Sequence, residues 1–125
     1  MATDPVANIT EAVVQIALEM WKLLRSFERA IEDIPSEKQA RRAAQQRYSQ
    51  GRLDAILEDS GIRILTFDGQ KFTANLPVTP LNADEIENSE NAIVESTLEP
   101  TIIGRNSVLH TGKVMLLGDQ NVSGD

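Results

Sequence analysis

The stretch LDAILEDSGIRIL, residues 53–65, decides the fold class because the spacing of its apolar residues changes within it. Leu53, Ile56 and Leu57 are three and four residues apart, as on one face of a helix. From Ile62 onward the period changes to two, which is typical of a strand. Gly61 stands between the two patterns, at the position after a helix C-cap where glycine is favoured because it adopts positive φ angles. The sequence therefore predicts an α+β chain whose helices precede its strands.

Residues 8–34, upstream of this stretch, show the clearest helical periodicity in the chain. Their apolar residues are spaced alternately four and three apart, the heptad spacing of helices that pack on one another. These residues are Val13, Ala17, Met20, Leu24, Phe27, Ile31 and Ile34. Pro35 ends this helix because it lacks an amide hydrogen, and a second helix is expected from Ser36, which forms a capping-box pattern with Gln39, to Ser60. Residues 1–61 are thus predicted to form a helical hairpin.

The first half of the first predicted helix is apolar on more than one face. Val14, Leu18 and Trp21 lie beside the heptad stripe, and a single second helix cannot cover both stripes. We therefore expect a homodimer in which two hairpins form a four-helix bundle. The residues expected at the dimer interface are Val13, Val14, Ala17, Leu18, Met20, Trp21, Leu24 and Phe27.

Residues 62–117 are predicted to form a small β domain of four to six short strands. Asp68-Gly69 is the dipeptide preferred in type I′ turns, so a β-hairpin is expected around it. Pro77 and Pro80 are expected to break regular structure, and the acidic segment that follows them has low strand propensity. Further strands are expected within residues 92–98, 101–103 and 107–117, followed by a frayed tail at residues 118–125.

Composition excludes several classes of function. The chain has 125 residues, a net charge of −7 and only 4% aromatic residues, so it lacks the clustered cations and stacking rings of a nucleic-acid-binding surface. It has no cysteine, which excludes disulfides and thiolate metal sites. No run of eighteen apolar residues and no signal-peptide pattern occurs, so we expect a soluble cytoplasmic protein that does not bind membranes.

The groups that catalysis requires are missing from the sequence. His110 is the one histidine, it lies within a predicted strand, and no second imidazole or thiol can join it. Neither GxGxxG nor GxxxxGK[ST] occurs, so no phosphate-binding loop is predicted. The acids Asp84, Glu85 and Glu87 lack the spacing of an EF-hand. We expect a protein that is not an enzyme and that holds no cofactor or metal.

The order of the elements resembles that of GrpE-type nucleotide exchange factors, which serve DnaK-type chaperone ATPases. The resemblance covers residues 15–117 and rests on LLRSFERAIEDIP at 23–35, LDAILEDSGIRI at 53–64 and VESTLEPTIIGRNSVLHTGKVML at 94–116. The long N-terminal coiled coil of that family is absent from this sequence. The resemblance implies a dimeric four-helix bundle followed by a β domain that reaches the ATPase.

Two functions follow from this resemblance. The first is nucleotide exchange, in which the β domain binds the open form of the ATPase better than the closed form. The alternative is a GrpE-derived scaffold or adaptor that binds another protein without exchange activity. The adaptor is favoured by the closing motif, in which the family's glycine-arginine turn is Asn106-Ser107 and its following arginine is His110.

The predicted partner-binding residues are Arg105, His110 and Lys113. The family's terminal strands and turn face the ATPase, and here these residues are the only cationic or basic ones after Lys71. The long acidic stretch beside them would help to orient a protein partner. The competing interpretation is that Arg105 and Lys113 only offset Glu95 and Glu99 on neighbouring strands.

Overall fold

The structure, a computed structural model, describes residues 5–86 and 91–118, and the chain divides into two compact units, Met1–Arg63 and Ile64–Asp125. We refer to them as the helical unit and the β unit. Two helices come first and six strands follow, so the predicted α+β fold with an N-terminal helical hairpin is confirmed. The predicted tail at 118–125 lies outside the described residues, apart from Gly118.

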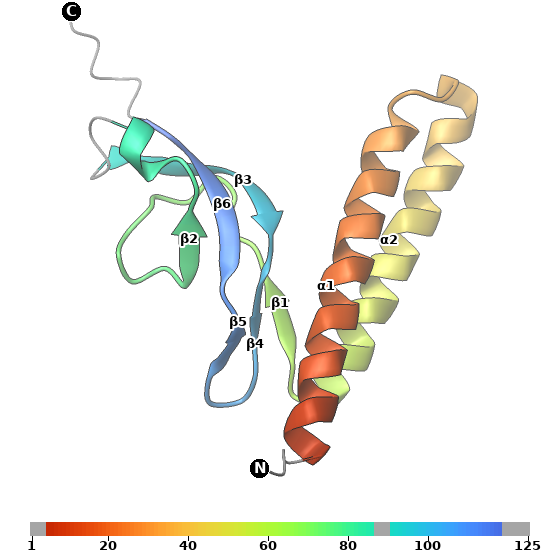
Figure 1. Cartoon of the computed structure of the whole chain (residues 1–125). Helices are drawn as coiled ribbons and strands as arrows, with labels where there is room; N and C mark the ends of the chain where they lie inside the picture. Colours follow the sequence, from red (N-terminus) through yellow and green to blue (C-terminus); the bar gives the residue numbers. More distant parts are fainter. Residues whose placement is uncertain (1–4, 87–90, 119–125) are drawn as a thin grey trace, which may run out of the picture. The chain divides into compact units, whose positions relative to one another are not determined.

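The helical unit is a hairpin of α1 (Pro5–Ile31) and α2 (Ser36–Asp59), which run side by side (Figure 1). α1 begins three residues before the predicted start. A proline is tolerated there because the first amides of a helix have no partner within it. The predicted capping box at Ser36 is wrong, because Pro35 is the N-cap and no side chain caps α2. The Gln39 side-chain amide instead donates to the carbonyl oxygen of Ile34 at 3.1 Å.

The end of α2 agrees with the sequence-based prediction: the helix ends at Asp59, Ser60 is its C-cap and Gly61 occupies the C′ position. The amide of Gly61, whose φ is 77°, donates to Glu58 at 2.9 Å, and the amide of Ile62 donates to Leu57 at 2.9 Å. These two bonds form a Schellman motif, and the buried Leu57 and Ile62 are the apolar pair that usually accompanies it.

The β unit contains two three-stranded sheets (Figure 1). The first has the order β1-β4-β5, with strands Arg63–Leu65, Thr101–Ile103 and Val108–His110. The second has the order β2-β6-β3, with strands Val78–Pro80, Gly112–Leu117 and Ile93–Glu99. β3 and β6 are antiparallel, and β2 is parallel to β6. A short 3₁₀ helix, η1 (Ala83–Glu85), follows β2.

The core of the β unit lies along the antiparallel pair β3 and β6. Ala92, Val94, Val114 and Leu116 are at most 2% exposed, and their alternation along the strands places them on one face. Partly buried apolar residues cover this cluster: Phe67, Phe72, Leu76, Val78 and Ile86. The core is mostly aliphatic, as the low aromatic content predicts.

The β-hairpin predicted around Asp68-Gly69 is wrong. Only Gly69 has a positive φ, 84°, whereas a type I′ turn needs positive φ at both central residues. The chain after the turn pairs with β3 instead, because the amide of Gly69 donates to Val94 at 2.7 Å and that of Phe72 donates to Ala92 at 2.9 Å. The residues after Asp68-Gly69 therefore pair with a strand that comes more than twenty residues later, and not with the strand just before the turn.

β2 forms where the sequence predicts a break. Pro80 is compatible with this strand because β2 lies at the edge of its sheet, where a missing amide leaves no neighbour unpaired. Beyond β2, the Asn82 side chain continues the pairing: its amide donates to the Leu116 carbonyl at 2.9 Å and its oxygen accepts from the Leu116 amide at 2.8 Å. The Asn82 side chain thus makes the two hydrogen bonds to Leu116 that the backbone of one further strand residue would make.

Candidate functional site

The predicted partner-binding residues lie on and between the last three strands. β4 and β5 form an antiparallel hairpin, and the Gly104 amide donates to the Ser107 carbonyl at 2.8 Å to close its turn. Arg105, Asn106 and Ser107 are all exposed in this turn. The tip of the hairpin therefore presents one cation and two small polar side chains to solvent.

The base of this hairpin is held by buried groups. Ile102 is fully buried, and the Thr101 hydroxyl donates to the Pro77 carbonyl at 2.7 Å while accepting from the Gly112 amide at 3.1 Å. Gly112 has no room for a side chain, because a Cβ there would lie 2.7 Å from the Glu99 carbonyl oxygen. These contacts fix β4 against the start of β6, and so fix where the turn emerges.

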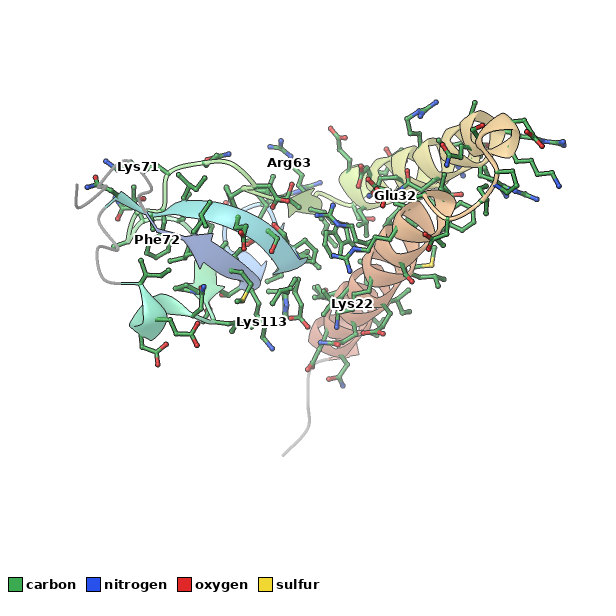
Figure 2. All side chains as sticks on the ribbon, turned by 90° about the horizontal axis from the view of Figure 1, so that it is seen from above. Lys22, Glu32, Arg63, Lys71, Phe72 and Lys113 are labelled. Carbon is green, nitrogen blue, oxygen red and sulfur yellow. The ribbon has the colours of Figure 1, made fainter. Side chains whose placement is uncertain are left out.

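Glu99, at the end of β3, lies at the centre of the candidate site. Its Oε1 is 3.0 Å from His110 Nε2 and 3.8 Å from Lys113 Nζ. The Glu99 side chain is only 15% exposed, that of His110 is 22% exposed and that of Lys113 is 50% exposed. Figure 2 shows Lys113 at the surface of the β unit. One carboxylate therefore joins three strands from two sheets and holds both basic side chains.

The structure brings together two of the three predicted residues and separates the third. His110 and Lys113 share Glu99, whereas Arg105 lies in the turn, where the described part of the chain offers it no ion-pair partner. The predicted pairing of Lys113 with Glu99 is confirmed, since the two residues are opposite each other in the β3–β6 register. The corresponding pairing is not confirmed for Arg105.

The central role of Glu99 was not predicted as part of the site. The sequence places it in an acidic stretch, and the contact with His110 depends on a chain reversal between β4 and β5 that spacing alone does not reveal. The other acids of the stretch that the structure describes, Asp84, Glu85 and Glu95, are exposed. Glu87 and Glu90 lie outside the described residues.

The residues predicted for a dimer interface are mostly buried in the chain. Five of the eight have little exposed surface: Val14, Ala17, Leu18, Trp21 and Leu24. Val13 and Phe27 are half-buried, and Met20 is 39% exposed. The large apolar residues of α1 that remain most exposed are Ile9, Ile16 and Leu23, each close to two-thirds exposed. The dimer stays a prediction. Most of the residues expected at its interface are buried within the chain, and the three most exposed apolar residues of α1 are not among those expected.

Within the described residues, no group of three or more His, Asp or Glu side chains is arranged to hold a metal ion. No described helix combines the length and the apolar character needed to cross a membrane. Comparison of the chain with protein-family models, with curated proteins and with solved structures found no match.

Proposed function

We propose that the chain is a GrpE-like co-chaperone that acts as a nucleotide exchange factor for a DnaK-type ATPase, with the β unit making the contact. The observation that carries this proposal is the order of elements: a helical hairpin followed by a β unit whose last strands occupy the region that the resemblance places against the ATPase. The geometry of β4 to β6 adds an exposed turn with Arg105 and a half-exposed Lys113.

In the proposed mechanism the β unit acts as a wedge. Exchange requires only that it bind the open nucleotide cleft more tightly than the closed one, because a ligand shifts an equilibrium by its differential affinity for the two states. Arg105 and Lys113 would contact acidic groups exposed by opening, which also raises the association rate. The buried base of the β4–β5 hairpin supports this role, because a hairpin that holds the cleft open must keep its own conformation when its turn contacts the ATPase.

A homodimer formed through α1 belongs to this proposal. Ile9, Ile16 and Leu23 are exposed and lie seven residues apart, which is heptad spacing. These residues would let α1 pair with a second copy, although most of the residues expected at the dimer interface are buried within the chain. Sedimentation at micromolar concentration that detects monomer alone would contradict the dimer without affecting the wedge.

The adaptor function is favoured by one observation. Glu99 engages both His110 and Lys113, so these side chains are less available to an ATPase than free cations would be. An adaptor would use the β unit to bind another protein, without nucleotide exchange activity.

The test is release of fluorescently labelled ADP from the DnaK-type ATPase of the same organism, followed by stopped flow. The wild-type chain is expected to accelerate release, and the double variant Arg105→Glu/Lys113→Glu is expected to lose about tenfold or more of that acceleration. Lys71→Glu is the matched control, because Lys71 is an exposed cation of the same unit outside β4 to β6 (Figure 2). Full acceleration by the double variant would reject this surface, and no acceleration by the wild type would reject exchange.

A further inference from the structure

Glu99 is an acidic residue at the centre of a surface that is proposed to bind acidic groups, and no step of the proposed mechanism uses it. Its Oε1 lies 3.0 Å from His110 Nε2 and 3.8 Å from Lys113 Nζ. A carboxylate at this place offers Lys113 the same chemical group that an acidic partner would offer. Glu99 and an acidic side chain of a partner therefore compete for one ammonium group.

The backbone of β3 holds the Glu99 carboxylate in place. Glu99 lies opposite Lys113 in the register of β3 and β6. Pro100, which is less than 2% exposed, restricts Glu99 to extended conformations. Gly112 approaches Glu99 so closely that an added Cβ would lie 2.7 Å from its carbonyl oxygen. The carboxylate therefore reaches Lys113 without any rearrangement of the strands, which makes it a preorganised competitor.

Of the two basic side chains that Glu99 contacts, Lys113 is the one that a partner can take. The contact of Glu99 with His110 has the length of a hydrogen bond, and both side chains are less than a quarter exposed. The contact with Lys113 is 0.8 Å longer than this, and half of the Lys113 side chain is exposed. Lys113 can therefore turn toward a partner while the carboxylate stays on His110.

Arg105 does not take part in this competition. It is exposed in the turn between β4 and β5, and none of the acidic residues that the structure describes forms an ion pair with it. An acidic group of a partner gains a complete contact at Arg105. At Lys113 it gains only the difference between its own contact and the contact with Glu99 that it replaces.

We infer that Glu99 is an intramolecular competitor for Lys113, which an acidic partner must displace. The surface then favours partners with at least two acidic groups, one that meets Arg105 and one that takes Lys113 from Glu99. This inference rests on the surface of the proposed function, and it holds for an exchange factor and for an adaptor alike. Removal of the Glu99 charge should strengthen binding, whereas removal of a residue that only supports the surface would weaken binding.

The test titrates the full chain with a synthetic hexaglutamate peptide and follows the backbone amides of residues 105 and 113 by NMR. Glu99→Gln removes the charge and keeps a side-chain oxygen that can accept from His110. It is expected to lower the dissociation constant about threefold, as the loss of one half-exposed ion pair allows. Glu99→Ala removes the same charge, and the same gain is expected from it. Amide shifts elsewhere in the β unit report whether each variant keeps its fold.

Two controls separate competition for Lys113 from a general effect of charge. Glu95→Gln removes an exposed acid of the same strand, and it is expected to change the dissociation constant by about 1.5-fold or less. In a Lys113→Gln background, Glu99→Gln is expected to have an equally small effect, because the contact that it would remove is already absent.

Three results would overturn the inference: no gain from either Glu99 variant, an equal gain from Glu95→Gln, and an equal gain in the Lys113→Gln background. Release of labelled ADP from the ATPase, measured with the wild-type chain, tests the proposed function separately. No acceleration would reject nucleotide exchange, while the peptide titrations would still decide the role of Glu99.

Discussion

Gly112 is the position at which the β unit leaves no room for a side chain. A Cβ there would lie 2.7 Å from the Glu99 carbonyl oxygen, 2.7 Å from the Thr101 hydroxyl and 2.9 Å from the Thr101 amide nitrogen. Two of these three atoms belong to the backbone, so the strands themselves would have to move apart. The same residue donates to Thr101, which makes it part of the support for the candidate site.

Gly112→Ala is therefore expected to lower the free energy of unfolding of the β unit by about 2 kcal/mol, the usual cost of overpacking. Gly118→Ala is the matched control, since its added Cβ would meet only Ile86 at an ordinary 3.6 Å. Hydrogen exchange of the β6 amides measures the stability of the β unit in both variants. Equal protection in the two variants would mean that β4 and β6 are held less rigidly than the contacts of Thr101 imply.

At the scale of elements, α2 contains two glycines with opposite expected effects. Gly51 lies inside the helix with no atom within 4 Å of an added Cβ, whereas Gly61 ends it with a φ of 77°. Gly51→Ala should raise the free energy of unfolding by about 0.5–1 kcal/mol because alanine favours helix, and Gly61→Ala should lower it by about 1 kcal/mol because alanine resists positive φ.

Urea unfolding followed by the fluorescence of Trp21 measures both changes, because this buried residue lies in the same unit as α2. A shift in the same direction for both variants would contradict the assignment of Gly61 as the residue that ends the helix.

These elements also show what the sequence could predict. The hairpin and the end of α2 were predictable because heptad spacing and a C′ glycine are local signals. The pairing of residues 69–72 with β3, the strand β2 and the contact of Glu99 with His110 were not, because each depends on residues brought together only by the fold. Arg105 and Lys113 could be named as surface cations and Glu99 as the carboxylate that pairs with Lys113, but the contact of the same carboxylate with His110 could not be predicted.

At the scale of the whole molecule, the proposed exchange function links two equilibria: binding of the chain to the ATPase and binding of ADP to the ATPase. If the chain favours the open form of the ATPase, it must weaken the binding of ADP, and ADP must weaken the binding of the chain by the same factor. An adaptor has no such coupling. The proposal therefore depends on a difference in affinity, and tight binding alone does not support it.

The most direct measurement is the dissociation constant between the full chain and the DnaK-type ATPase of the same organism, determined by calorimetry without nucleotide and with saturating ADP. The account predicts that ADP weakens binding by about tenfold or more, within the usual range of coupling free energies, and that the chain weakens ADP binding equally. Dissociation constants that are the same with and without ADP would contradict nucleotide exchange and identify the chain as an adaptor.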